Sequence, residues 1–279
     1  AVVELRRLRP ELEPGDAELM SWAALSVLGS ISDHRVRLPR AAFEELLAGI
    51  AMGVASAEFD AAVMDNRPQG IDSADRRERI LAAAARLFWD RGYHAVTLEE
   101  IGAAAGIAGP SIYSHFAGKT DLLRTITERI GERLRLTSDE PPAAEPEPAH
   151  SPSAATDRLT AESALAALTT RYVTTVLTSR DLVAAYFTEG HNLPDRDRAE
   201  TRRFQRAYAA HWAALLAAAR PEQSPEEVRI RVLAAFAVVN DTARTRRLAD
   251  RPGLAGRLRA LMLAVLLTPA SGTGDVNHG

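Results

Sequence analysis

The 279-residue sequence contains no cysteine, which excludes disulfide frameworks and thiolate-ligated zinc or iron–sulfur sites. Its seven histidines are scattered without the spacing of metal ligands, so neither a metal nor a cofactor is expected. No run approaches the roughly 20 apolar residues of a membrane-spanning helix, and the N-terminus lacks an apolar signal core. These absences predict a cytoplasmic protein without membrane association.

A strong charge of one sign is also lacking, because 34 basic and 37 acidic residues leave a formal net charge of −3. Such a chain is not coated for nucleic acid, although a local patch would suffice to bind it. Catalytic motifs are missing as well: there is no G-x-S-x-G elbow. The stretch "AGKT" resembles the end of a phosphate-binding loop, but that motif requires glycine where Tyr113 stands. We therefore expect no enzymatic activity.

Strand-like alternation is absent, and nearly every apolar pattern has the helical period, so the predicted fold class is all-α. Two polar breaks divide the chain, one near residues 64 to 74 and one rich in Pro and Glu at 137 to 156. The predicted divisions are a helical hairpin at 1–64, a linker at 65–74, a helix-turn-helix domain at 75–136, a flexible loop at 137–156, a helical domain at 157–268 and a disordered tail at 269–279.

The chain repeats part of itself after a shift of 211 residues, which gives twelve identities between Leu5 and Val54 and their counterparts. Chance would give about four or five in a sequence of this composition. In both copies an Arg-Pro-Glu turn precedes a helix that begins with proline, where the missing N–H is not needed. We interpret the copies, at 14–59 and 225–267, as related helical hairpins; the alternative is two unrelated amphipathic hairpins.

Between Asp75 and Arg135 the pattern indicates one longer helix followed by two short helices joined by a glycine turn. Thr97 and Glu100 have capping-box spacing, and Gly106 closes the short helix that they begin. The next stretch, "GIAGPSIYSHFAGK", holds aromatics, hydroxyls, a histidine and a lysine but no acid. An acid-free segment in this position is typical of the DNA-facing helix of a three-helix helix-turn-helix domain.

The run "RILAAAARLFWDRGYHAVTLEEIGAAAGIAGPSIYSHFAGKTDLL" resembles the DNA-binding domain of TetR-family transcriptional regulators. The resemblance covers about 60 residues and rests on many spaced matches, such as Ile112-Tyr113-x-His115-Phe116. It implies an N-terminal helix-turn-helix domain that binds double-stranded operator DNA, and a C-terminal domain that binds a small effector and dimerises. Two departures, Ala108 in place of a hydroxyl cap and Gly109 in place of a polar residue, predict weaker binding.

Ile112 and Phe116 lie one turn apart on a recognition helix of about 110 to 116, so we expect both to anchor inward. The candidate DNA-binding residues are Thr97, Ser111, Tyr113, Ser114, His115 and Lys119. Hydroxyl and imidazole groups suit phosphate oxygens, and a lysine at a helix N-terminus adds positive charge. Plain alternatives are core packing of Tyr113, a surface histidine and a solvated lysine. Arg76, Arg77 and Arg79 either contact phosphates or form a solvated face.

Residues 157 to 219 predict three helices that carry the candidate effector-binding residues Tyr172, Tyr186, Phe187, Phe204, Tyr208 and His211. These side chains could wall a mostly apolar cavity between helices. Ordinary core packing is the simpler alternative for such a face. The resemblance loosely implies a hydrophobic effector.

The final helices of such regulators imply a four-helix dimer bundle, which gives the repeat a meaning. We expect residues 1–64 to be the dimerisation hairpin of a preceding, truncated unit of a tandem regulator. Hairpins 14–59 and 225–267 would then form an intramolecular pseudo-dimer; otherwise the chain would form a homodimer. The predicted function is an effector-responsive repressor that binds operator DNA. The alternative is a ligand sensor or protein-interaction module whose single head no longer binds DNA.

Overall fold

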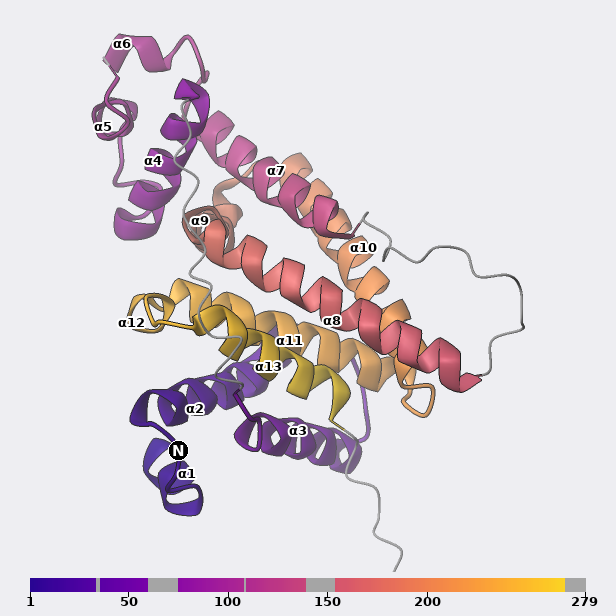
Figure 1. Cartoon of the computed structure of the whole chain (residues 1–279). Helices are drawn as coiled ribbons and strands as arrows, with labels where there is room; N and C mark the ends of the chain where they lie inside the picture. Colours follow the sequence, from indigo (N-terminus) through magenta and orange to yellow (C-terminus); the bar gives the residue numbers. More distant parts are fainter. Residues whose placement is uncertain (34–35, 60–74, 108, 139–153, 269–279) are drawn as a thin grey trace, which may run out of the picture. The chain divides into compact units, whose positions relative to one another are not determined.

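The computed structural model describes residues 1–33, 36–59, 75–107, 109–138 and 154–268. Within these ranges every regular element is a helix, which confirms the all-α prediction (Figure 1). None of the helices in the described segments is long and apolar enough to cross a membrane, and no group of metal-ligating side chains occurs there. The linker, the Pro/Glu-rich loop and the tail predicted from the sequence lie largely outside the described residues.

The chain forms two compact units, and neither is continuous in the sequence. The first unit comprises Ala1–Arg67, Pro142–Val173 and Ala209–Gly279, and the second comprises Pro68–Pro141 and Thr174–Tyr208. The division falls within two long helices, α8 (Ala154–Thr178) and α10 (Asp195–Ala219).

The first unit brings both copies of the sequence repeat together. Its elements are α1 (Val2–Leu8), α2 (Pro14–Gly29), η1 (Ser30–Asp33), α3 (Arg40–Ala55), α11 (Pro225–Arg244), α12 (Arg246–Ala249) and α13 (Leu254–Leu267), with parts of α8 and α10. Helix α2 packs against α3 and α11, and α13 packs against α11 and α3. The two hairpins therefore form a four-helix bundle within one chain (Figure 1).

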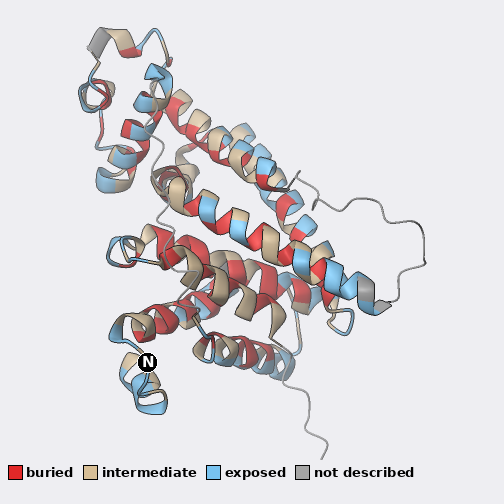
Figure 2. Cartoon of the chain, in the orientation of Figure 1, coloured by how far each residue is buried: buried red, intermediate tan, exposed pale blue. Residues whose placement is uncertain are grey.

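Apolar stripes explain why these helices bury against one another. In α2 the stripe includes Ala17, Met20 and Val27, each at most 1% exposed, and in α11 it includes Val228 and Val238. Buried residues run along both helices in Figure 2. Helix α11 begins with a complete capping box at Ser224, whereas the N-cap of α2, Glu13, makes no side-chain hydrogen bond.

The equivalent arginines of the repeat make equivalent contacts. Arg9 donates from Nη1 to the carbonyls of Ala55 and Ala57, at the end of α3. Arg220, which is 211 positions later, donates to the carbonyl of Leu267, at the end of α13. Arginine satisfies the unpaired C-terminal carbonyls of a helix and complements its dipole. Each Arg-Pro-Glu turn thus closes its own hairpin.

The second unit contains the predicted helix-turn-helix. Its elements are α4 (Arg76–Arg91), α5 (Leu98–Ala104), α6 (Gly109–Ile112), α7 (Lys119–Ser138), α9 (Arg180–Glu189) and η3 (Gly190–Asn192), with parts of α8 and α10. Phe88, Ile101, Ile112 and Phe116 share one buried cluster with residues of α7 and α9. Gly92, with φ 84°, ends α4, and Gly106, with φ 68°, follows α5. Both positions require the left-handed backbone that glycine adopts without strain.

Candidate nucleic-acid interface

Helix α5 is held at its start by the capping box that the sequence predicts. The Thr97 hydroxyl accepts from the Glu100 amide at 3.2 Å, and the Glu100 carboxylate accepts from the Thr97 amide at 2.8 Å. This backbone hydrogen bond, followed by one from Arg91, lowers the pKa of the Glu100 carboxyl. The oxygen of Thr97 is used as an acceptor, so its hydrogen stays available for donation to a phosphate.

The recognition segment differs in one respect from the predicted helix of about 110 to 116. The α-helix ends at Ile112, and residues 113 to 115 continue as turns. The amides of His115 and Phe116 both bond the carbonyl of Ile112 at 3.0 Å, which tightens the chain toward its second anchor. Ile112 and Phe116 are at most 1% exposed, which confirms that both anchor inward.

Tyr113 and Ser114 lie on the exposed side of this segment, while Ser111 and His115 are half-buried. Tyr113 is 56% exposed, which excludes the core-packing alternative, and its hydroxyl lies 3.5 Å from the Glu99 carboxylate. The Ser114 hydroxyl donates to the Ser111 carbonyl at 2.7 Å. This bond occupies the donor of Ser114 and leaves its oxygen lone pairs for a base or for water.

Lys119 begins α7, as expected, but it is not a free cation. Its Nζ donates to the Tyr93 carbonyl at 2.9 Å and lies 4.7 Å from the centre of the Tyr93 ring. The Tyr93 hydroxyl is in turn 3.0 Å from the Thr120 hydroxyl. An ammonium has three donors, so two remain after the carbonyl bond. The contact fixes the charge at the helix start rather than leaving it on a mobile stem.

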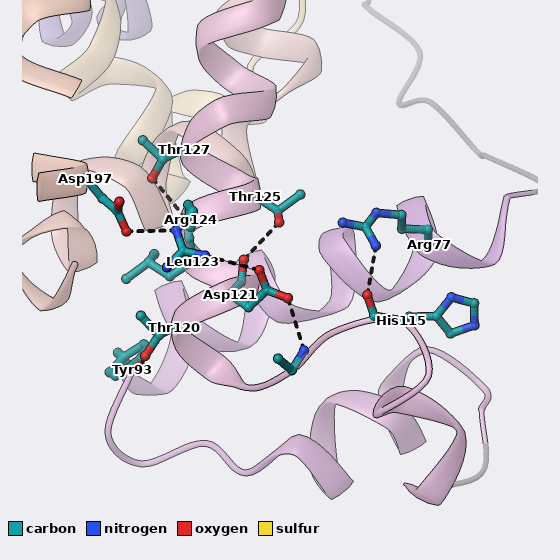
Figure 3. A network of polar contacts seen from close by, with 11 residues as sticks. Arg77, Tyr93, His115, Thr120, Asp121, Leu123, Arg124, Thr125, Thr127 and Asp197 are labelled. Carbon is teal, nitrogen blue, oxygen red and sulfur yellow. Dashed lines mark hydrogen bonds and ion pairs between the residues drawn. The ribbon is translucent and has the colours of Figure 1, made fainter. Parts of the chain in front are cut away.

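Arg77 has a role that the sequence analysis missed. Its Nη1 donates to the His115 carbonyl at 2.8 Å, and its guanidinium lies 4.2 Å from the centre of the Phe116 ring. Figure 3 shows this side chain reaching from α4 to the end of the recognition segment. The contact joins residues 38 positions apart, so no local pattern could have revealed it. Arg77 thus positions the recognition segment.

A second polar network joins α7 to the start of α10 (Figure 3). The Asp121 carboxylate accepts from the Ala117 amide at 3.0 Å, just after the recognition segment. Arg124 bonds Asp197 at 2.8 Å and also lies 3.5 Å from Asp121. Partial desolvation is the main cause that raises the pKa of the nearby Glu128 carboxyl, which is otherwise exposed. These groups connect the end of the recognition segment to the first turn of α10 within the second unit.

The two departures from the family pattern fall where the structure says little. Ala108 lies outside the described residues, and Gly109 is described only as the first residue of α6. The weaker binding predicted from these positions stays a prediction.

The six predicted effector-binding residues divide between the two units. Tyr172 and His211 belong to the first unit, whereas Tyr186, Phe187, Phe204 and Tyr208 belong to the second.

In the first unit, Tyr172 is buried against Trp212 and Phe236, and its hydroxyl donates to Asn240 at 3.0 Å. These contacts match the core-packing alternative for Tyr172. His211 is exposed.

In the second unit, Phe204 stacks on Tyr208 with ring centres 5.8 Å apart, and the Tyr208 hydroxyl lies 3.2 Å from the Thr137 hydroxyl. Tyr186 makes an edge contact with Phe187 and bonds Gln205. Burial raises the pKa of the Tyr186 hydroxyl. The four predicted residues of the second unit therefore form two aromatic pairs.

Comparison with known proteins agrees with this geometry. Residues 80–126 match the family of bacterial regulatory proteins, tetR family, and residues 158–244 match the tetracyclin repressor-like C-terminal domain. The HTH-type transcriptional activator FasR of Mycolicibacterium smegmatis is 37% identical over 73 residues, which cover 23% of this chain and 33% of that protein. The HTH-type transcriptional repressor BepR of Brucella suis is 41% identical over 58 residues, 21% of this chain and 28% of that protein.

Among solved structures, the TetR family transcriptional regulator PfmR from Thermus thermophilus is similar in fold, with a TM-score of 0.53 and 19% identity. That similarity covers 67% of this chain and 97% of PfmR. The chain spans about a third of the length of the curated relatives it matches.

Proposed function

Because the chain belongs to the TetR family, we propose that it is a transcriptional repressor that binds operator DNA through α4 to α7 and is released by a small effector. The observation that carries the proposal is the recognition segment, where Tyr113 and Ser114 are exposed directly between two buried anchors. An outward face held by a rigid core is what reading of a major groove requires.

The proposed contacts divide into two kinds. Thr97, Tyr113, His115 and Lys119 bind phosphate oxygens, which position the domain without reading sequence. Ser111 and Ser114 meet base edges, where a hydroxyl discriminates weakly. The Asp121 carboxylate lies near the start of α7, so its negative charge offsets part of the positive charge of Lys119 there. We therefore expect modest affinity and a measurable salt dependence.

The test is a DNA-binding titration against the upstream region of the protein's own gene across a salt series. Log affinity should fall linearly with log salt concentration, since phosphate contacts release counterions. Tyr113→Phe should weaken binding to all sites alike and leave the slope nearly unchanged, because a neutral hydroxyl releases no counterion. Thr188→Ala, which removes another exposed hydroxyl bonded within its own helix, is the control and should change nothing. Absence of binding at low salt would favour the sensor alternative.

For the effector, we propose a binding place beside the Phe204 and Tyr208 pair in the second unit. Gly131 of α7 supports this choice, because a Cβ there would lie 3.8 Å from the Phe204 ring. An apolar effector next to this ring would contact α7 directly. Gly131→Leu should then lower effector affinity without lowering DNA affinity, as measured by effector-induced release; equal loss of both would reject this location.

We also propose that the chain is an intramolecular pseudo-dimer from a tandem regulator. Three observations support it, and the first two are the four-helix packing of α2, α3, α11 and α13 and the equivalent contacts of Arg9 and Arg220. The third is the outward side of the first hairpin. Leu25 and Leu28 are 55% and 46% exposed, whereas their counterparts Phe236 and Val239 pack inside the first unit.

Light scattering tests this arrangement directly. A pseudo-dimer should have the mass of one chain at all concentrations, because its bundle is already complete. A homodimer whose interface uses α11 and α13 would reject the proposal.

A further inference from the structure

The start of α2 is acidic, and it meets basic side chains at α12 and α13 within the first unit. Asp16 forms two hydrogen bonds with Arg257, at 2.5 Å and 3.3 Å, and both side chains are at most 16% exposed. Glu18 pairs with Arg247 at 2.9 Å and also with Arg251. Arg251 donates in addition to the Gly15 carbonyl. The first hairpin is thus bound to the second by a cluster of opposite charges.

The repeat register shows that this charge pattern is not duplicated. A shift of 211 residues places Arg229 at the position of Glu18 and Arg40 at the position of Arg251. Both residues at the equivalent positions of the repeat are therefore basic, and both are exposed. The two hairpins of the bundle share a fold and an apolar stripe, but they differ in which of these equivalent positions carry acidic and basic side chains.

This difference has a consequence for a second copy of the chain. If its α11 and α13 replaced the first hairpin in the same register, its Arg229 would stand where Glu18 stands, against Arg247 and Arg251. Twofold symmetry would repeat the like-charge contact, because each surface of such a dimer occurs twice. Like charges placed together at an interface suppress the wrong partner.

A buried position points in the same direction. Arg231 is fully buried in α11, and its counterpart in α2 is Met20, which is 1% exposed. The bundle with the hairpin therefore buries one guanidinium and one methionine at equivalent positions. A homodimer would bury two guanidinium groups in one bundle, at a greater desolvation cost.

We infer that Glu18, Arg229 and Arg251 are specificity residues through which the chain pairs with its own first hairpin and rejects a second copy of itself. The inference rests on the proposed pseudo-dimer and adds the chemical reason for its selectivity. It concerns partner choice and not stability, since the same apolar stripes serve either pairing.

The experiment measures the mass of the intact chain by sedimentation and light scattering from 1 to 100 µM. Arg251→Glu sets a carboxylate against Glu18 in the hairpin pairing, but against Arg229 twice in a homodimer. We expect the parent to have the mass of one chain and this variant to shift toward two chains, with the shift reduced in high salt. Arg206→Glu changes an exposed arginine of α10 by the same charge and should leave the mass unchanged.

A second variant does not touch the hairpin contacts. Arg229→Glu leaves Glu18 and Arg251 paired and makes the homodimer contact attractive, so we expect self-association to tighten about tenfold or more. Unchanged self-association of both folded variants would overturn the charge selection while the pseudo-dimer stands. A parent that is itself a homodimer through α11 and α13 would instead overturn the proposed pseudo-dimer.

Discussion

Arg231 offers a quantitative test of the bundle, because a charged side chain is fully buried there without a full set of partners. Its Nη1 donates to the Val265 carbonyl at 2.8 Å. Its Nε and Nη2 have no hydrogen-bond partner among the described residues. The equivalent position of the first hairpin holds Met20, so the fold already accommodates an unbranched apolar side chain in this setting. The perturbation is Arg231→Met.

The expected change in the free energy of unfolding follows from the cost of keeping the buried Arg231 guanidinium charged. Burial lowers the pKa of the Arg231 guanidinium from 12.5 to about 10. At about 1.4 kcal/mol per pKa unit, the charged form is disfavoured in the folded state by roughly 3 kcal/mol. This cost is fully present below the folded pKa and disappears as the pH rises toward the unfolded one. Methionine removes the cost but loses the bond to Val265, worth about 1.5 to 3 kcal/mol. We expect a net stabilisation of about 1 kcal/mol.

Thermal and urea unfolding at pH 7 measure this difference. A gain of 1 kcal/mol raises the Tm by about 2 to 4 °C in a unit of this size. Arg220→Met is the matched control, because Arg220 is fully engaged: it bonds Glu162 at 2.5 Å and the Leu267 carbonyl at 3.0 Å. Its loss should lower the stability by about 1 to 3 kcal/mol.

A loss of more than about 1 kcal/mol of stability in Arg231→Met would contradict the cost assigned to burying this guanidinium. Such a result would mean that the guanidinium of Arg231 is well solvated or paired in solution. If Arg231→Met and Arg220→Met lost the same stability, the number of hydrogen-bond partners of each guanidinium would not explain how much it contributes to stability.

Three further predictions concern other parts of the chain. Leu25→Asp should leave the Tm nearly unchanged because the side chain is exposed, whereas Val27→Asp, two positions along α2, should unfold the first unit. Equal effects of the two substitutions on the Tm would contradict the exposure of Leu25. Burial raises the pKa of the Asp181 carboxyl, so its charged form costs stability above that pKa; Asp181→Asn should raise the Tm at pH 7 and not below pH 3. Thr97→Ala should cost about 1 kcal/mol in unfolding titrations and weaken DNA binding, and serine should restore both.

Much of the helix-turn-helix region could be predicted from the sequence, because the hydrogen bonds and buried anchors that shape it join residues close together in the chain. The capping box of Thr97 and Glu100 joins residues three apart, and the anchors Ile112 and Phe116 are one turn apart. The capping box at Ser224 is equally local, because it joins Ser224 to Glu227, three residues along. The length of α6 was not predicted, since residues 113 to 115 form turns that lead the chain to Phe116.

The contacts that position the candidate site were missed because they join distant residues. Arg77 bonds the His115 carbonyl, and Lys119 bonds the Tyr93 carbonyl, whereas the sequence suggested a phosphate contact or a solvated charge for each. An arginine side chain is long and has many rotamers, so its partner depends on which helix lies beside it.

The sequence by itself determined the helices, their caps, the helix-turn-helix and the repeat, because these depend on periodicity and on hydrogen bonds within a few residues. Only the tertiary structure decided that α2 packs against α11, that Asp16 pairs with Arg257 and Glu18 with Arg251, and that the predicted effector residues divide between two units. The physical reason is that two hairpins with the same apolar stripe can pair in more than one way. The pairing is selected by side-chain packing and by ion pairs between residues far apart in the sequence, and no local sequence pattern predicts either.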